Sequence, residues 1–170
     1  EGSARLDALY NRAFTDPVLL GTYPELLREE LAPFVHKGDL ETIHQPLDFF
    51  GLNHYTTMRA RSAHGTALGV EILPPPREIP QTIKGWEINP AMLHQQLLEF
   101  KNRYGNPPIY ITENGCASPD VLDAEGKVSD PDRVDYFRDY LSAASLAIED
   151  GVNLKGYFAW SLLDNFEWAE

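Results

Sequence analysis

The stretch that decides the fold is NPAMLHQQLLEFKNRYGNPPIYITENG, at residues 89–115. Asn89-Pro90 is a typical helix start, because asparagine caps a helix and proline fits its first position. Apolar side chains then recur at helical spacing until Gly105, a natural helix end. Residues 108–112, which are rich in β-branched side chains, favour a strand. This stretch therefore predicts a helix that leads directly into a strand.

Toward the N-terminus, the pattern predicts two helices and another strand. Residues 3–14 have one apolar face and predict a helix. We expect Asp16-Pro17 to end it, because a residue before proline disfavours the helical conformation. A shorter helix is expected at residues 24–34. Residues 47–56 predict a strand that is apolar on both faces, as a buried parallel strand is.

Toward the C-terminus, the alternation of helices and strands continues. Residues 57–88 are a long connection, in which short strands are expected near 58–63 and 69–73. Asp-Pro opens a second long helix at residues 131–148, and residues 155–160 predict a third main strand. The side chains of this helix that we expect to face inward are Val134, Phe137, Leu141, Ala144 and Ile148.

This order of elements predicts an α/β fold with a parallel sheet, although it does not show whether the sheet is open or closed. The 170 residues, 43% of them hydrophobic, suffice for one domain with a core. A net charge of −12 argues against a nucleic-acid partner. No apolar run is long enough to span a membrane, and a single cysteine excludes an internal disulfide. With no signal peptide visible, a cytoplasmic protein is expected.

Polar and aromatic residues cluster at the carboxyl ends of all three main strands, where parallel α/β folds place their ligand sites. Any one of them alone is more often a packing or surface residue, and the three ends together favour a site. These residues are Asn53, His54 and Tyr55 after the first strand, Glu113 and Asn114 after the second, and Trp160, Asp164, Asn165, Glu167 and Trp168 at and beyond the third.

Two combinations of these residues point to chemistry. Glu113 follows an apolar strand at the rim of the core, where a carboxylate is costly unless it is paired or used. Trp160, Glu167 and Trp168 suggest a sugar, because sugar rings lie on indole faces and their hydroxyls bond to carboxylates. The alternatives are a surface glutamate at a turn and a buried aromatic corner.

Other classes of site lack their patterns, so we expect no cofactor and no metal. No glycine-rich phosphate loop follows a strand, and no Gly-x-Ser-x-Gly elbow is present. Cys116 has no evident base and is interpreted as a small buried thiol. The histidines do not have the close spacing of metal ligands; they are His36, His44, His54, His64 and His94.

Three motifs carry a resemblance: ITENG at residues 111–115, DFFGLNHY at 48–55 and GYFAWSLLDNFEW at 156–168. They resemble the nucleophile motif, the sixth barrel strand, and the eighth strand with its following loop in glycoside hydrolase family 1, the retaining β-glucosidase family. Supporting matches, in the family's order, are NRAF at 11–14, DP at 16–17, GTYP at 21–24 and GWEI at 85–88.

The resemblance implies a (β/α)8 TIM barrel with its site at the carboxyl-terminal face. Residues 1–170 would be the C-terminal portion of one catalytic domain, truncated at both ends, with about three parallel strands and their helices. The expected partners are a small β-glycoside or oligosaccharide and the remainder of the barrel, with no nucleic acid and no membrane.

The resemblance assigns two catalytic roles. Glu113 would be the nucleophile that forms a covalent glycosyl-enzyme, and Tyr55 would donate a hydrogen bond that orients it and favours its ionised form. His54 departs from the commoner aromatic residue and is interpreted as packing or as a support of the site. The family's acid/base motif, Thr-x-Asn-Glu-Pro, is absent, so the 170-residue chain alone is expected to be inactive.

The resemblance also assigns the substrate contacts. Trp160 would lie under the sugar, Glu167 would bind two of its hydroxyls, and Trp168 would donate its indole N–H to another. Asn53 would line the same pocket, and Trp86 would face the leaving group at the entrance. Because an anionic Glu167 repels phosphate, unphosphorylated glycosides are preferred.

Several alternatives stay open at this stage. A non-catalytic carbohydrate-binding fragment would keep the same aromatic and acidic contacts. Within the family, a thioglucosidase, a β-galactosidase or a β-fucosidase can share this set of contacts. The sugar, the aglycone and the oligomeric state are not determined by these residues.

Overall fold

The computed structural model describes residues 1–168. The chain forms two compact units: one comprises Glu1–Leu47 and Met58–Pro74, and the other comprises Asp48–Thr57 and the chain from Pro75 on. None of the described helices is both long and apolar enough to cross a membrane. The sites predicted from the sequence all fall in the second unit.

The first unit consists of short helices and a two-stranded antiparallel hairpin. The hairpin confirms the short strands expected in the long connection. In chain order the elements are α1 (Gly2–Asp7), the π-helical turn η1 (Ala8–Arg12), α2 (Ala13–Leu20), the 3-10 turn η2 (Glu25–Leu27), α3 (Arg28–Leu31), the 3-10 turn η3 (Ala32–Phe34), α4 (Asp39–Ile43), β2 (Arg59–Ser62) and β3 (Val70–Leu73).

The predicted helix end at Asp16-Pro17 is wrong, because α2 continues to Leu20 with Pro17 inside it. Asp16 is 2% exposed, and its Oδ2 accepts hydrogen bonds from Arg12 Nε at 3.1 Å and Nη2 at 3.0 Å. On a helix, side chains four residues apart are neighbours. This buried ion pair therefore stabilises a helical turn that the Asp-Pro signal alone argues against.

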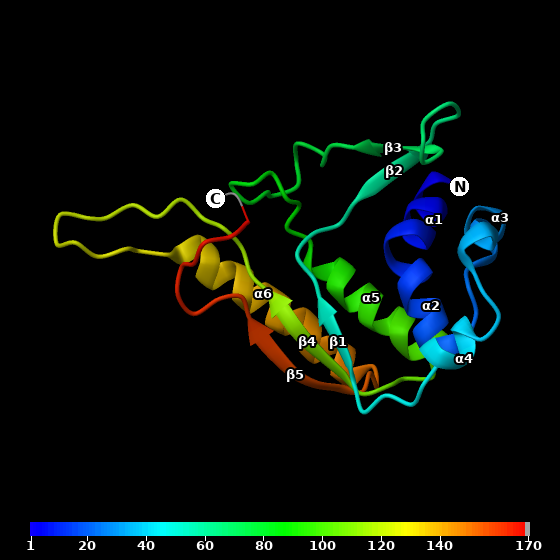
Figure 1. Cartoon of the computed structure of the whole chain (residues 1–170). Coiled ribbons are helices and arrows are strands. Elements are labelled where there is room, and N and C mark those ends of the chain that lie inside the picture. Colours follow the sequence, from blue (N-terminus) through cyan, green and yellow to red (C-terminus); the bar gives the residue numbers. More distant parts are fainter. Residues whose placement is uncertain (169–170) are drawn as a thin grey trace. The chain divides into compact units, whose positions relative to one another are not determined.

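The second unit is built on a parallel sheet with strand order β1-β4-β5, made of Phe50–Asn53, Ile109–Asn114 and Leu154–Ala159. Helices α5 (Pro90–Arg103) and α6 (Pro131–Glu149) run alongside these strands (Figure 1). Both helices begin at the predicted prolines. The strand–helix alternation predicted from the sequence is confirmed.

The core of this unit lies between the sheet and the two helices. Each fully buried leucine or isoleucine contributes about 1.5–3 kcal/mol relative to an exposed one. The buried apolar side chains are Leu52 from β1, Leu93, Leu97 and Phe100 from α5, Ile109 and Ile111 from β4, and Tyr136, Tyr140, Ala143, Ala144 and Ala147 from α6.

The inward face predicted for the second long helix is largely wrong. Ala144 is buried, but Val134, Leu141 and Ile148 are 64%, 47% and 52% exposed. The buried face consists instead of alanines, which allow close packing, and of tyrosines whose hydroxyls have buried partners. Tyr136 accepts a hydrogen bond from Asn114 Nδ2 at 2.9 Å. The buried face of α6 therefore includes hydroxyl groups with partners, which hydropathy alone does not reveal.

An irregularity in the pairing of β1 with β4 sets the register at the carboxyl end of the sheet. Leu52 lies opposite Ile111, but after a shift in register Asn53 lies opposite Glu113. Thr112 is passed over, and its hydroxyl donates to Asn53 Oδ1 at 2.6 Å. Such irregularities often re-aim side chains beside active sites. This one brings the end of β1 level with Glu113.

Candidate active site

Glu113 and Tyr55 form a direct pair at the carboxyl end of the sheet. Glu113 lies near the end of β4, Tyr55 follows β1, and the tyrosine hydroxyl donates to Glu113 Oε2 at 2.7 Å. Burial, the hydrogen bond and charge of Glu113, and the charge of Glu167 all raise the pKa of Tyr55. The tyrosine therefore stays protonated and remains a donor to the carboxylate at neutral and alkaline pH.

A third predicted residue of the site, Trp86, lies beside Tyr55. Its ring packs edge-on against Tyr55, with the centroids 5.7 Å apart and an angle of 60° between the planes. The side chain is 40% exposed, and Lys84 Nζ lies 6.0 Å from the centre of its ring. Trp86 therefore forms a wall beside Tyr55 and keeps part of its surface open to a ligand.

Trp160 and Glu167 form a second pair beyond β5. Trp160 Nε1 donates to Glu167 Oε2 at 3.2 Å, and the indole is 43% exposed. The backbone N–H of Trp160 donates to the carbonyl of Asn114 at 2.9 Å, which continues the ladder between β4 and β5 up to the aromatic residue. An open indole and a carboxylate are thus held together, the two kinds of contact that a sugar ring uses.

The two other predicted sugar contacts, Asn53 and Trp168, differ from each other in their surroundings. Asn53 lies exposed at the end of β1, with its side-chain oxygen held by Thr112. Trp168 is 91% exposed and has a left-handed backbone with φ 56°. The structure thus brings Asn53 to the strand end that carries Glu113 and leaves the Trp168 side chain standing out into solvent.

Gly115 allows a close approach directly after this carboxylate. A Cβ atom at this position would lie 2.0 Å from the carbonyl oxygen of Trp160. Real Cβ atoms do not come so close to the backbone, so any other residue would push the two chain segments apart. The Asn-Gly pair that suggests a turn in the sequence is therefore also a packing requirement between Glu113 and Trp160.

The family model for Glycosyl hydrolase family 1 matches residues 1–170. The chain belongs to this family. The match covers both structural units and all of the candidate site residues, so the resemblance seen in the three motifs is confirmed over the whole sequence.

Relatives of this family 1 chain are β-glucosidases. Beta-glucosidase A of Thermotoga maritima is 42% identical over 160 residues, which are 92% of this chain and 35% of that protein. A Bifidobacterium breve enzyme described as bifunctional beta-D-glucosidase/beta-D-fucosidase is 42% identical, over 97% of this chain and 40% of that protein. The chain thus spans about 35–40% of the length of these relatives.

The family 1 fold is confirmed by similarity to solved structures. The psychrophilic beta-glucosidase BglU of Micrococcus antarcticus matches 99% of this chain with a TM-score of 0.89 and 41% identity, and the match covers 41% of that chain. The α/β structure with parallel strands described above is therefore part of a TIM barrel. In such a barrel, the sheet face opposite the helices lines the interior.

His54 is buried and packed in this family 1 chain, in keeping with the first of its two interpretations, packing or a support of the site. It is 7% exposed, its Nδ1 lies 2.7 Å from Gln96 Oε1, and its ring packs against Tyr140 with the centroids 5.9 Å apart. Burial lowers the pKa of His54, because the charged imidazolium would lose its hydration. The neutral form is therefore the one that the fold accommodates.

Replacing His54 with phenylalanine should make the fold less sensitive to acid. In the unfolded chain, histidine titrates near its ordinary pKa of about 6.5, and in the fold it titrates lower. The stability that depends on neutral His54 is therefore complete above that value and is lost as the pH falls below it. Between about pH 7.5 and about pH 5, the unfolding free energy in urea should fall more for the wild type than for His54→Phe. Equal falls would contradict this, and His64→Phe, at an exposed histidine, is the control.

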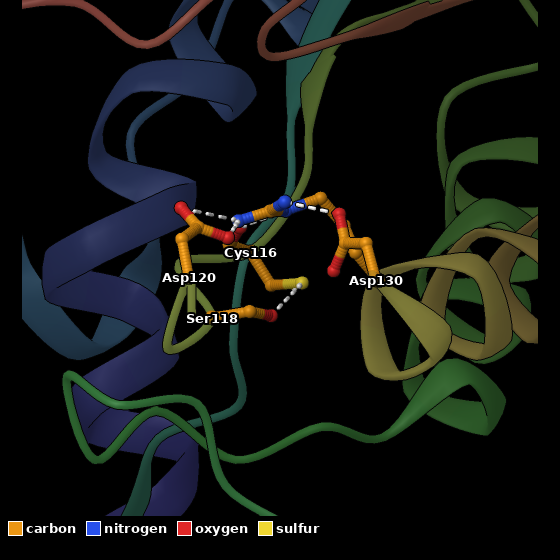
Figure 2. A network of polar contacts seen from close by, with 5 residues as sticks. Cys116, Ser118, Asp120 and Asp130 are labelled. Atoms are coloured by element: carbon orange, nitrogen blue, oxygen red, sulfur yellow. Dashed lines mark hydrogen bonds and ion pairs between the residues drawn. The ribbon is translucent and has the colours of Figure 1, made fainter. Parts of the chain in front are cut away.

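A polar network that sequence analysis missed holds the loop after Glu113 (Figure 2). Arg133, in the first turn of α6, donates from Nε to the carbonyl of Cys116 at 3.3 Å and from Nη2 to Asp120 at 3.2 Å, and it also pairs with Asp130. Burial alone would lower the pKa of Arg133, but the hydrogen bond to Asp130 and the two aspartate charges raise it. This charged clamp joins the start of the loop to α6.

Cys116 itself is half-buried and carries no sign of reactivity. Its Sγ lies 3.8 Å from Ser118 Oγ, and burial raises the pKa of its thiol. A raised pKa disfavours the nucleophilic thiolate. Within residues 1–168, no group of three or more His, Cys, Asp or Glu side chains is arranged to hold a metal ion.

Proposed function

We propose that this chain is the C-terminal portion of a single (β/α)8 catalytic domain that hydrolyses β-D-glycosides, with β-glucosides as its main substrates. The support is threefold: the family, the order of its motifs along the chain, and relatives described as β-glucosidases. The observation that carries the proposal is the Tyr55–Glu113 hydrogen bond of 2.7 Å at the carboxyl end of a parallel sheet.

The reaction proceeds by double displacement. Glu113 attacks the anomeric carbon, the bond from that carbon to the leaving oxygen breaks, and a covalent glycosyl-enzyme forms. Tyr55 keeps the carboxylate oriented during the attack. A second carboxyl group protonates the leaving oxygen and then activates the water that releases the sugar, so the configuration is retained. In retaining enzymes that carboxyl lies about 5–5.5 Å from the nucleophile.

The sugar lies on Trp160, and Glu167 binds two of its hydroxyls. Asn53 and the indole N–H of Trp168 complete the pocket, and Trp86 contacts the leaving group. For Trp168 this role requires its exposed side chain to turn toward the sugar. The carboxylate of Glu167 repels phosphate, which favours unphosphorylated glycosides. Because the Bifidobacterium breve relative is described as acting on both glucosides and fucosides, β-fucosides are a second class of substrate to test.

A mechanism-based 2-fluoro-glycoside with an activated leaving group tests this function in the complete family 1 polypeptide. The activated group leaves without acid assistance, so attachment reports the nucleophile alone. We expect one covalent sugar, located on Glu113 by peptide mass spectrometry. Reversible binding without attachment would instead support a non-catalytic carbohydrate-binding protein.

The purified 170-residue chain by itself should show no glycosidase turnover. Its sequence lacks the Thr-x-Asn-Glu-Pro motif that carries the acid/base carboxyl, so an ordinary leaving group would depart unprotonated. The measurement is hydrolysis of a β-glucoside by the chain alone and by the complete polypeptide at equal molar concentration. Robust turnover by the chain alone would contradict the proposal that it is only a portion of the catalytic domain.

A further inference from the structure

Asn114 is a fully buried amide that directly follows Glu113, with 0% of its surface exposed. Its Nδ2 donates to the carbonyl of His54 at 2.6 Å and to the hydroxyl of Tyr136 at 2.9 Å. Its Oδ1 accepts a hydrogen bond from the hydroxyl of Tyr157. Both donor hydrogens and the acceptor of the amide are therefore used in a place that water does not reach.

Two partners of this amide, His54 and Tyr157, belong to segments that lead to residues of the candidate site. His54 directly precedes Tyr55, so the bond to its carbonyl fixes the backbone from which Tyr55 extends. Tyr157 belongs to β5, the strand that leads into Trp160. Asn114 itself is joined covalently to Glu113. One side chain thus connects the ends of β1, β4 and β5, and each of these ends carries a residue of the site.

Only a carboxamide supplies this combination of bonds. Aspartate has the same shape, but its carboxylate has no donor, and it would place an oxygen against the carbonyl of His54. Leucine would fill the volume and remove all three hydrogen bonds, including those to the carbonyl of His54 and from the hydroxyl of Tyr157, which is costly in a buried place. The chemistry at this position is therefore specific, whereas a packing role would be served by many side chains.

We propose that Asn114 is a positioning residue for the glycosylation step. It holds the backbone of Tyr55 against β4, so that the tyrosine hydroxyl and the Glu113 carboxylate meet in the geometry needed for attack. The inference rests on the proposed function, because it assigns Glu113 as the nucleophile. It predicts a much larger effect on the rate of bond formation than on sugar binding, since the backbone N–H of Trp160 bonds to the carbonyl of Asn114 and not to its side chain.

The test is Asn114→Asp in the complete polypeptide, with the activated 2-fluoro-glycoside as the probe. A small displacement of a reacting group costs up to about 100-fold in rate, so we expect the maximal rate of covalent labelling to fall by roughly 10- to 100-fold. The concentration for half-maximal labelling should change by no more than about threefold, because binding contacts are retained. If Asn114 had a purely structural role, Asn114→Asp would lower the melting temperature without reducing the maximal labelling rate more than it changes the half-maximal concentration.

A matched control is Asn153→Asp, at the opposite end of the same sheet. Asn153 is a partly buried asparagine, and its Nδ2 donates to the carbonyl of Asn106 at 3.5 Å. The control should cost stability and leave the labelling rate within about twofold of the wild type. An equal loss of rate in both variants would assign the effect to general destabilisation and overturn the proposal.

A double-mutant cycle with Tyr55→Phe tests the route of the effect. If Asn114 acts by aligning Tyr55, then Asn114→Asp should cost much less in the Tyr55→Phe background, and the two losses should not add. Full additivity would overturn the proposal. Should Asn114→Asp fail to fold, Tyr157→Phe removes a single bond to the same amide. It should slow labelling by about tenfold at unchanged half-saturation, and an unchanged rate would overturn the proposal.

Failure of this inference can be distinguished from failure of the proposed function. Labelling of the wild type on Glu113, together with a wild-type rate in Asn114→Asp, overturns the positioning role and leaves the function standing. No labelling of the wild type removes the function and the positioning role with it.

Discussion

Replacing Glu113 with alanine abolishes the turnover of β-glucosides by the complete enzyme, with a loss of at least about 10⁴-fold. The substitution removes the carboxylate that we propose forms the glycosyl-enzyme and leaves the Tyr55 hydroxyl without its acceptor. It also leaves a space in which a small anion can take the place of the carboxylate. Azide or formate should therefore restore part of the turnover of an activated glycoside, measured by release of its chromogenic leaving group.

The control for this prediction is Glu125→Ala, which removes an exposed glutamate from the loop between β4 and α6. Its turnover should stay within about twofold of the wild type, as surface substitutions away from a site usually do. Normal turnover in Glu113→Ala would eliminate the nucleophile assignment. Equal stimulation of the wild type and the variant by azide would show that the anion does not act at position 113.

Replacing Glu167 with alanine should lower kcat/KM for a β-glucoside by roughly 10³-fold. Charge-assisted hydrogen bonds to substrate hydroxyls are strong, and a site built to make them discriminates by about 10⁴-fold or more against partners that lack them. The variant also frees the indole N–H of Trp160, which donates to Glu167 at 3.2 Å. The measurement is kcat/KM of the complete enzyme on an aryl β-glucoside.

Monodeoxy glycosides give this prediction its internal control. If Glu167 binds two hydroxyls, the cost of Glu167→Ala should shrink on the two substrates that lack one of them and stay large on the others. A loss of the same size on every deoxy substrate would show that the substitution disturbs the whole arrangement of Trp160 and its surroundings. In that case the direct contact with sugar hydroxyls would be wrong.

Local signals in the sequence were sufficient for the elements that frame the site. Pro90 and Pro131 mark the starts of α5 and α6, because proline satisfies a helix start whatever lies around it. The orientation of α6 was not predictable in the same way. Tyr136 and Tyr140 look amphipathic in the sequence, and they turn inward because Asn114 and the Asn89 backbone supply donors for their hydroxyls.

The residues of the site divide in the same way, into those that local motifs predicted and those that they did not. Glu113 and Tyr55 were found through the motifs and lie together in the structure. From the sequence, Asn114 is interpreted only as part of a strand end and a turn. In the structure its amide bonds to Tyr136 and to the carbonyl of His54, which lie 22 and 60 positions away along the chain. Arg133 was missed for the same reason, since its partner Cys116 is 17 positions away. Hydrogen bonds between residues so far apart in the sequence depend on the fold, and no local sequence pattern predicts them.

The close approach at Gly115 has a consequence for protein engineering. The carbonyl oxygen of Trp160 lies only 2.0 Å from the place of a Cβ, so the absence of a side chain at Gly115 sets the spacing between Glu113, the proposed nucleophile, and Trp160, on which we propose that the sugar lies. A library aimed at new leaving groups should therefore vary Trp86, whose side chain is 40% exposed and which we propose contacts the leaving group. The segment from Glu113 to Gly115 should be held constant, because diversity there would alter the reaction geometry before it altered the choice of substrate.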